Sequence, residues 1–160
     1  MKLNELQKAL RVYKRQHDGD PDITSVVMDS REVQPGSLFV CVPGERFDGH
    51  DFVKDVMDRG AVAFVAERSI ETDLPVIYVS EARRALAILV DAFYDQPTKK
   101  LSLIGVTGTN GKTTITHLVK HIQEYAHINT GLVGTMGIKY GEKEIPVHNT
   151  TPEAPILQKA

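Results

Sequence analysis

Thr107-Gly-Thr-Asn-Gly-Lys-Thr-Thr-Ile115 is a glycine-rich stretch that follows an apolar run at 101–106 and precedes a segment of helical periodicity. Glycines at 108 and 111 allow main-chain N–H groups to converge on phosphate oxygens, and a helix N-terminus attracts the anion. In loops of this kind the lysine, here Lys112, reaches the β- and γ-phosphates, and the next hydroxyl, Thr113, ligates Mg²⁺. The stretch therefore predicts a phosphate-binding loop for a nucleoside triphosphate.

The segments on either side of the loop support this prediction. Residues 101–106 have the pattern of a short strand that is buried on both faces of a parallel sheet. Apolar residues recur at helical spacing up to about residue 127, namely at Ile115, Leu118, Val119 and Ile122. The strict loop pattern would place glycine at 106, where this chain has Val106. A glycine-rich turn without a ligand is the alternative, and Gly-Lys-Thr at the helix start favours the phosphate loop.

Composition limits the classes of protein that the chain can represent. Its 160 residues, 41% hydrophobic and 25% charged, suit one large or two small globular domains. A net charge of −2 without a basic stripe argues against a nucleic-acid partner. No apolar run approaches the roughly 20 residues that span a bilayer, and the N-terminus lacks a signal-peptide core, so we expect a cytoplasmic protein without a membrane partner. The single cysteine, Cys41, excludes an internal disulfide and is expected in the core.

Residues 1–100 alternate between helical and strand patterns, which predicts an independent α/β domain. We expect helices at 3–16, 50–59 and 80–94, and strands at 23–28, 38–42, 61–66 and 76–79. Gly60 is placed to end the second helix, and Ser80 to cap the third. The first helix would bury four residues, which are Leu3, Leu6, Leu10 and Tyr13. Pro97 then breaks the pattern, so we place the domain boundary at about 96–100, with domains at 1–97 and 98–160.

The last part of the chain is expected to begin, but not to complete, a parallel sheet. A further parallel strand is expected near 130–134, followed by a hairpin with strands near Ile138 and Ile145 and a turn at Gly141. Because a parallel sheet needs several strands and cover on both faces, Leu103, Ile104 and Leu132 should lack apolar partners. We therefore expect a folded first domain and a poorly stabilised second one.

Two polar clusters are candidate binding sites, although residue type alone makes each an ordinary loop. Asp29-Ser-Arg31 follows a strand, where ligands of α/β domains tend to bind, but a polar turn with a surface salt bridge is the simpler interpretation. Asn149-Thr-Thr-Pro-Glu153 offers an amide and two hydroxyls in a proline-stiffened loop. His117 and His121 have a spacing that could bind a metal, but no third ligand is evident and a solvated helix face is favoured.

Taken together, seven segments resemble the N-terminal part of the Mur ligase family in their order and spacing. These segments are Asp29-Ser-Arg31, Pro35-Gly-Ser-Leu-Phe39, Asp48-Gly-His50, Gly60-Ala-Val-Ala63, Gly105–Thr114, Gly134-Thr135 and Thr150-Thr-Pro-Glu153. Within the family the chain most resembles the MurE type, which adds the third residue of the peptidoglycan stem peptide to UDP-N-acetylmuramoyl-L-alanyl-D-glutamate. The family's loop also lacks the first glycine of the strict pattern, which agrees with Val106. The glycine loop is shared with folylpolyglutamate synthetases, whereas the first and last segments together single out the MurE type.

The resemblance implies roles for individual residues. Gly108, Thr109, Asn110, Gly111, Lys112, Thr113 and Thr114 would bind ATP. Lys112 would neutralise the β- and γ-phosphates as the catalytic residue, and Thr113 would ligate Mg²⁺. Ser30 would contact the UDP-substrate from the first domain, and Asn149, Thr150 and Thr151 would hold its sugar and diphosphate from the second. In the family a substrate carboxylate becomes an acyl phosphate, which the amine of an amino acid then displaces, and positioning and charge neutralisation do most of this work.

The resemblance also implies an α/β fold in two parts, a mixed UDP-substrate domain and the start of a phosphate-loop ATPase domain. The family's enzymes have three domains and are considerably longer, so we expect these 160 residues to be inactive alone. The incoming amino acid would be diaminopimelate or lysine, and the expected state is a monomer. Two other functions remain open, which are a non-catalytic module that binds a UDP-sugar or ATP and an unrelated phosphate-loop NTPase.

Overall fold

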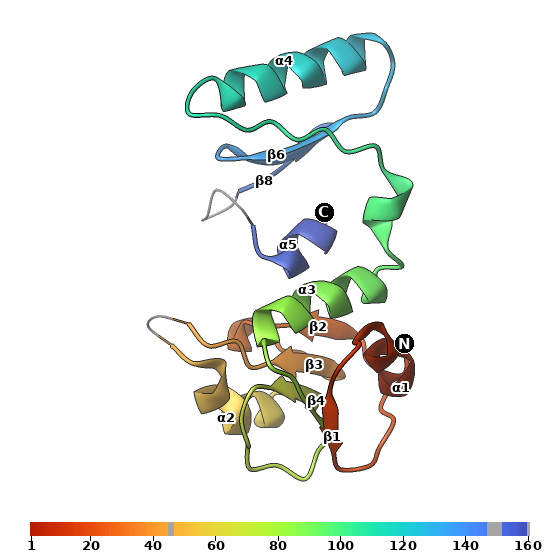
Figure 1. Cartoon of the computed structure of the whole chain (residues 1–160), viewed down its shortest axis with the longest axis vertical. Helices are drawn as coiled ribbons and strands as arrows, with labels where there is room; N and C mark the ends of the chain where they lie inside the picture. Colours follow the sequence, from red (N-terminus) through yellow and green to blue (C-terminus); the bar gives the residue numbers. More distant parts are fainter. Residues whose placement is uncertain (45–46, 147–151, 160) are drawn as a thin grey trace. The chain divides into compact units, whose positions relative to one another are not determined.

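The computed structural model describes residues 1–44, 47–146 and 152–159, which form two compact units (Figure 1). The first unit comprises residues 1–100 and the second residues 101–158, and each is described by itself. Among the described residues, no helix has the length and apolar character needed to cross a membrane.

A five-stranded sheet with order β1-β5-β4-β3-β2 forms the centre of the first unit. Its strands are β1 (Lys14–Gln16), β2 (Ser25–Val27), β3 (Ser37–Val40), β4 (Ala61–Ala66) and β5 (Val76–Tyr78). β2 to β5 run parallel to their neighbours, and β1 is antiparallel to β5 at the edge. The carboxyl ends of the four parallel strands therefore meet at one edge of the sheet, the place where α/β proteins bind ligands.

Helices cover both faces of this sheet, because its strands are apolar on both sides. One face packs against α1 (Leu3–Leu6) and α3 (Ala82–Phe93), with Leu38, Val65 and Ile77 in the core. The other face packs against α2 (Val53–Asp58), with Phe39 and Phe64 in edge-to-face contact. Cys41 is fully buried on this second side, as expected.

The predicted helix at 3–16 is wrong beyond its first two turns. α1 and a 3₁₀ turn, η1 (Gln7–Ala9), end before Leu10, and the chain then enters β1. Leu3, Leu6 and Leu10 are buried as expected, whereas Tyr13 is 38% exposed. Instead of continuing the helix, Lys14, Arg15 and Gln16 pair with β5 at the edge of the sheet. A sheet edge thus overrides the helical spacing at the end of this segment.

The cap of α3 also differs from the prediction. The helix begins one residue later than Ser80 allows, with Glu81 at the N-cap position and no cap bond from its side chain. Instead, Oε1 of Glu67 accepts a hydrogen bond from the main-chain N–H of Ala82 at 2.6 Å. The carboxylate that follows β4 therefore satisfies the helix N-terminus from a distant part of the sequence.

Short 3₁₀ turns complete the first unit, namely η2 (Ser30–Glu32), η3 (Gly49–Phe52) and η4 (Pro97–Lys100). η3 leads directly into α2, and this helix ends before Gly60, whose φ of +103° agrees with the expected glycine stop. A Cβ at Gly60 would lie 2.8 Å from the Cα of Pro35, so close packing also requires glycine here.

The second unit contains α4 (Lys112–Tyr125), an antiparallel sheet of β6 (Gly131–Gly134), β7 (Gly137–Tyr140) and β8 (Lys143–Ile145), and α5 (Ala154–Lys159). The expected hairpin around Gly141 is confirmed, since Ile138 pairs with Ile145 and Gly141 has a φ of +52°. The expected strand near 130–134 exists, but it pairs antiparallel with β7, so the prediction of a parallel strand is wrong.

Residues 101–106 do not form the predicted strand within the described part of the chain. A strand needs a neighbour, and none of the described strands pairs with these residues. Leu103 and Ile104 are accordingly 72% and 60% exposed, as expected for an incomplete sheet. Leu132 is buried, contrary to expectation, because β6 packs against α4. Among the described residues after 100, Leu132 and Ile138 are the buried hydrophobic side chains, so this unit has a small core.

Candidate functional site

The loop at 107–111 leads into the N-terminus of α4 through a glycine in a left-handed conformation. Gly111 is the N-cap residue of α4 and has φ of +77° and ψ of −4°, and Gly108 has φ of +151°. Both conformations strain any residue with a Cβ, which explains glycine at these positions. Since the first N–H groups of a helix lack partners within the helix, this N-terminus offers donors to an anion.

The side chain of Lys112 lies over the same loop. Its ammonium group donates to the carbonyl oxygen of Gly108 at 2.5 Å and to that of Thr109 at 3.3 Å. The cation is therefore within the loop that the glycines shape, although it belongs to the first residue of α4. A glycine-containing loop, a helix N-terminus and an ammonium group together fit a polyphosphate.

A pocket of about 180 Å³ borders the loop within the second unit. On one side lie residues of the first two turns of α4, which include Lys112, Thr113 and His117. On the other side lies the carboxyl end of β6 with the turn after it, including Gly134 and Thr135. Nδ1 of His117 lies 2.9 Å from the carbonyl oxygen of Thr113, so this ring is bound to the first turn of the helix. Of the residues predicted to bind ATP, Lys112 and Thr113 thus line this cavity.

Ser30 lies in the other unit, at the carboxyl end of β2, and is partly buried. Asp29 caps the 3₁₀ turn by accepting from the main-chain N–H of Arg31 at 2.9 Å, and its carboxylate also binds the guanidinium group at 2.6 Å. The hydrogen bonds from the Arg31 side chain hold the pKa of Asp29 below its usual value. The polar turn with a salt bridge is therefore present, and it fixes the backbone on both sides of Ser30.

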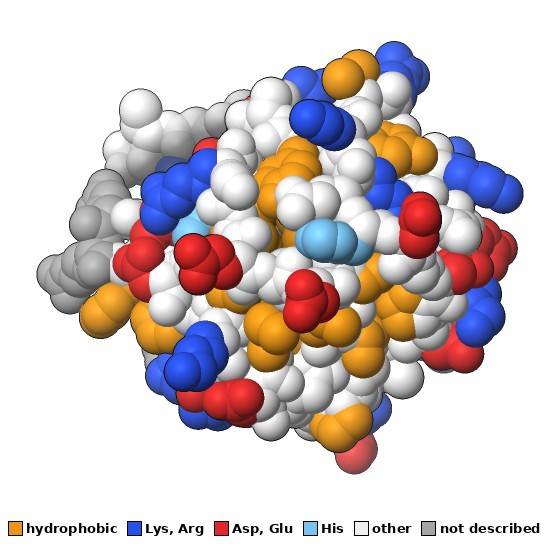
Figure 2. Space-filling view, turned by 90° about the horizontal axis from the view of Figure 1, so that it is seen from below, with side chains coloured by type: hydrophobic (Ala, Val, Ile, Leu, Met, Phe, Trp, Pro, Cys, Tyr) orange, Lys and Arg blue, Asp and Glu red, His pale blue; other side chains and the backbone are white. Residues whose placement is uncertain are grey.

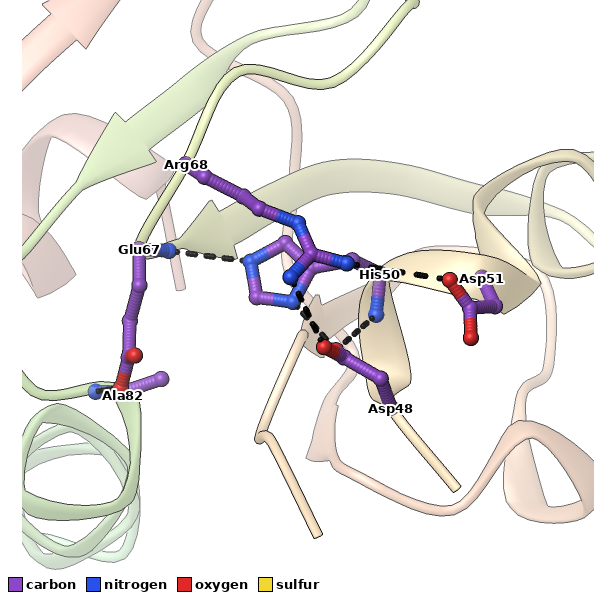
Figure 3. Close-up of polar contacts among 6 residues, drawn as sticks. All are labelled: Asp48, His50, Asp51, Glu67, Arg68 and Ala82. Carbon is purple, nitrogen blue, oxygen red and sulfur yellow. Dashed lines mark hydrogen bonds and ion pairs between the residues drawn. The ribbon is translucent and has the colours of Figure 1, made fainter. Parts of the chain in front are cut away.

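A polar cluster that we did not single out from residue types lies at the same edge of the first sheet (Figure 3). The ring of His50 is buried between the carboxylate of Asp48, 2.5 Å from Nδ1, and the main-chain N–H of Glu67, 3.1 Å from Nε2. Arg68 forms ion pairs with Asp48 at 3.0 Å and with Asp51 at 3.7 Å. The sequence signal was available, since Glu67 and Arg68 are charged residues directly after the buried strand β4.

Hydrogen bonds and charges in this cluster determine the ionisation state of Asp48. Burial alone would raise the pKa of this carboxyl, but hydrogen bonds from the main chain and ring of His50, together with the charge of Arg68, lower its pKa below the usual value. Asp48 therefore favours the ionised form, as an acceptor for the His50 ring.

The remaining candidates add no second site among the residues that the structure describes. Asn149, Thr150 and Thr151 lie outside that part of the chain. His117 and His121 belong to no group of three described residues suited to hold a metal. On the face in Figure 2, acidic and basic side chains are interspersed.

Sequence comparison gives this geometry a context. The family model described as Mur ligase family, catalytic domain, matches residues 22–94, and the Mur ligase middle domain matches residues 106–160. The first match contains Ser30 and the His50 cluster, and the second contains the loop from Thr107 to Thr114. The chain belongs to the Mur ligase family.

Comparison with individual Mur ligases shows which members of the family the chain resembles. It is 56% identical over 160 residues to the UDP-N-acetylmuramoyl-L-alanyl-D-glutamate–2,6-diaminopimelate ligase of Bacillus velezensis, covering 99% of this chain and 33% of that relative. A solved ligase of the same name shares the fold, with a TM-score of 0.74 and 23% identity over 100% of this chain and 33% of that one. The MurF ligase of Thermotoga maritima, solved with ADP, has a TM-score of 0.50 and 35% identity over 63% and 23% of the two chains. The chain thus spans about a third of the length of the curated relatives it matches.

Proposed function

We propose that this chain supplies the UDP-substrate and ATP-binding parts of a ligase that adds the third stem-peptide residue to UDP-N-acetylmuramoyl-L-alanyl-D-glutamate. The observation that carries the proposal is the loop at 107–114, where Gly111 opens α4 and Lys112 lies over the loop carbonyls. The 56% identity to a ligase of that name supports the choice of reaction.

ATP is the nucleotide in this proposal. The main-chain N–H groups from Gly108 onward and the ammonium of Lys112 would bind its β- and γ-phosphates, and Thr113 would offer one hydroxyl ligand to Mg²⁺. ADP in the related MurF ligase supports an adenine nucleotide. Mg²⁺, when bound, neutralises negative charge on the phosphoryl group that is transferred.

The residues of this chain would work by positioning and by neutralising charge. Phosphoryl transfer from ATP to the substrate carboxylate gives an acyl phosphate, and attack by the amine of the amino acid gives an amide and releases phosphate. Lys112 would stabilise negative charge on the transferring group, and the pocket beside it, next to Thr113 and Thr135, would admit the carboxylate. Ser30 would bind the UDP-substrate from the first unit, and Asn149, Thr150 and Thr151 would hold its sugar and diphosphate.

The amino acid in this proposal is 2,6-diaminopimelate rather than lysine, because the relatives' names specify it. The protein would act as a monomer in the cytoplasm, without nucleic-acid or membrane partners. The 160 residues alone would bind their ligands without turnover, since the chain matches only a third of each relative.

A chimera tests the proposal. Residues 1–160 of this chain would replace the matching third of the Bacillus velezensis ligase, and phosphate release would be measured with Mg·ATP, the UDP-dipeptide and diaminopimelate. We expect turnover that needs all three substrates, and none from the isolated chain. Lys112→Ala should lower kcat about 100-fold or more, as removal of a preorganised charge does. A folded chimera without turnover, or an active isolated chain, would contradict the proposal.

A further inference from the structure

A short segment after β3 leaves the sheet at the same edge as Ser30 and is held by main-chain hydrogen bonds. We call residues 41–44 and 47–49 the β3 exit segment. Pro43 and Asp48 form an isolated antiparallel bridge, the main-chain N–H of Gly44 donates to Phe47 at 3.0 Å, and that of Gly49 donates to Val42 at 3.1 Å. Because β2 and β3 are parallel neighbours in register, this segment and Ser30 leave the sheet at the same edge.

His50 follows this segment and connects it to the next strand. Nε2 must be unprotonated, since the main-chain N–H of Glu67 donates to it, and Nδ1 must then carry the proton that it donates to Asp48. Both ring nitrogens are therefore used, one toward the exit segment and one toward the end of β4. The ring spans the two strand exits like a strut (Figure 3).

The surroundings of His50 favour this single arrangement. The residue is 8% exposed, and a buried polar ring without partners would be costly. Asp48 is held in turn by Arg68 on its other oxygen, and the Glu67 side chain is occupied at the N-terminus of α3. Glycine at 49 lets the two ends of the segment pack closely, because a Cβ there would lie 2.8 Å from the Cα of Cys41.

We propose that His50 is a positioning residue for the UDP-substrate: as a neutral Nδ1–H imidazole it holds the β3 exit segment beside Ser30, so that both can contact the nucleotide end of the substrate. This inference rests on the proposed function. If it is correct, the effect of losing His50 falls on the UDP-substrate and leaves ATP binding unchanged, because the phosphate loop belongs to the other unit.

Steady-state kinetics of the chimera test the role in substrate binding. His50→Ala should raise KM for the UDP-dipeptide about tenfold, as expected when a hydrogen-bonded anchor is lost. KM for ATP and kcat should change less than about twofold. His50→Gln, whose Oε1 can still accept from Glu67, should give a smaller rise and serves if the alanine variant does not fold. His121→Ala, on exposed α4, is the matched control and should change nothing. An unchanged KM for the UDP-dipeptide, or equal changes in both KM values, would overturn the inference.

Two measurements without ligand separate this inference from the proposed function. Ring ¹⁵N shifts of His50 in the 160-residue chain should show the Nδ1–H tautomer, and amide exchange at Gly44 and Gly49 should accelerate in His50→Ala while exchange in α3 stays constant. Observation of the Nε2–H tautomer, or of unchanged amide exchange at both glycines, would refute the claim that His50 holds the segment. A chimera that lacks turnover with the native sequence would instead refute the proposed function, and these two measurements would still decide whether His50 holds the segment.

Discussion

Burial determines the chemistry of the Cys41 thiol. Its side chain is fully buried beside β3, and burial raises its pKa to about 12. A neutral, inaccessible thiol is unreactive. We therefore expect Cys41 to resist alkylation at pH 8 in the folded chain and to react at the rate of a free thiol in denaturant. Mass spectrometry of labelled protein follows both states, and rapid labelling under native conditions would contradict the buried position.

Asp48 should make the first unit sensitive to acid. Its folded-state pKa lies below the ordinary value of 3.8, so its ionised form favours folding above that pH, and this contribution disappears as the pH falls through the lowered pKa. Asp48→Asn should therefore be less stable than the native chain at pH 6, and the difference should shrink below about pH 4. Denaturant unfolding at several pH values measures it. Two parallel curves would show that the cluster does not hold this carboxylate ionised.

The structural role of some single residues could be predicted from the sequence, and that of others could not. The left-handed Gly111 and the position of Lys112 at the start of α4 agree with the loop pattern, and the binding of phosphate by these residues stays a prediction. The charged residues after β4 indicated a polar cluster, but the contact of His50 with residue 67 forms only after β3 and β4 are aligned. The capping of α3 by Glu67 was not predicted for the same reason. Local spacing favoured Ser80, and a partner distant in sequence replaced it.

At the scale of elements, α3 and α4 have similar periodicity but different surroundings. Leu89 on α3 is fully buried, whereas Leu118 on α4 is 56% exposed. Leu89→Ala should destabilise the first unit by about 2–5 kcal/mol, and the matched change Leu118→Ala should alter stability by no more than about 0.5 kcal/mol. Denaturant unfolding, followed by Cys41 labelling for the first unit and by circular dichroism for the chain, gives both values. Equal losses would mean that α4 is packed as well as α3.

Strands whose pattern allowed one interpretation were predicted well. β3 and β4 are buried on both faces, so their apolar runs had one interpretation. Residues 101–106 have a similar composition, but no described strand pairs with them. Residues 14–16 have a helical pattern but form a strand, because the edge of β5 is available for pairing. Pairing partners, which local sequence does not contain, decided both cases.

For the whole molecule, the two units should differ in resistance to proteolysis. The first has helices on both faces of its sheet, whereas the second exposes Leu103, Ile104, Leu118 and Ile122 and has a small core. Proteases cleave the transiently open state, so the less stable unit is lost first. Limited trypsin digestion should cut after residue 100 early and leave a resistant product near residues 1–100. Uniform protection of the whole chain would contradict this difference.

The central claim is that the loop at 107–114 binds the phosphates of Mg·ATP through main-chain N–H groups and Lys112. Calorimetric titration of the chimera with Mg·ATP tests it most directly, with Lys112→Ala compared to Lys120→Ala, which lies two turns further along α4. We expect saturable binding in the native sequence and in Lys120→Ala, and at least about tenfold weaker binding in Lys112→Ala. Binding of equal strength in all three proteins would contradict the claim.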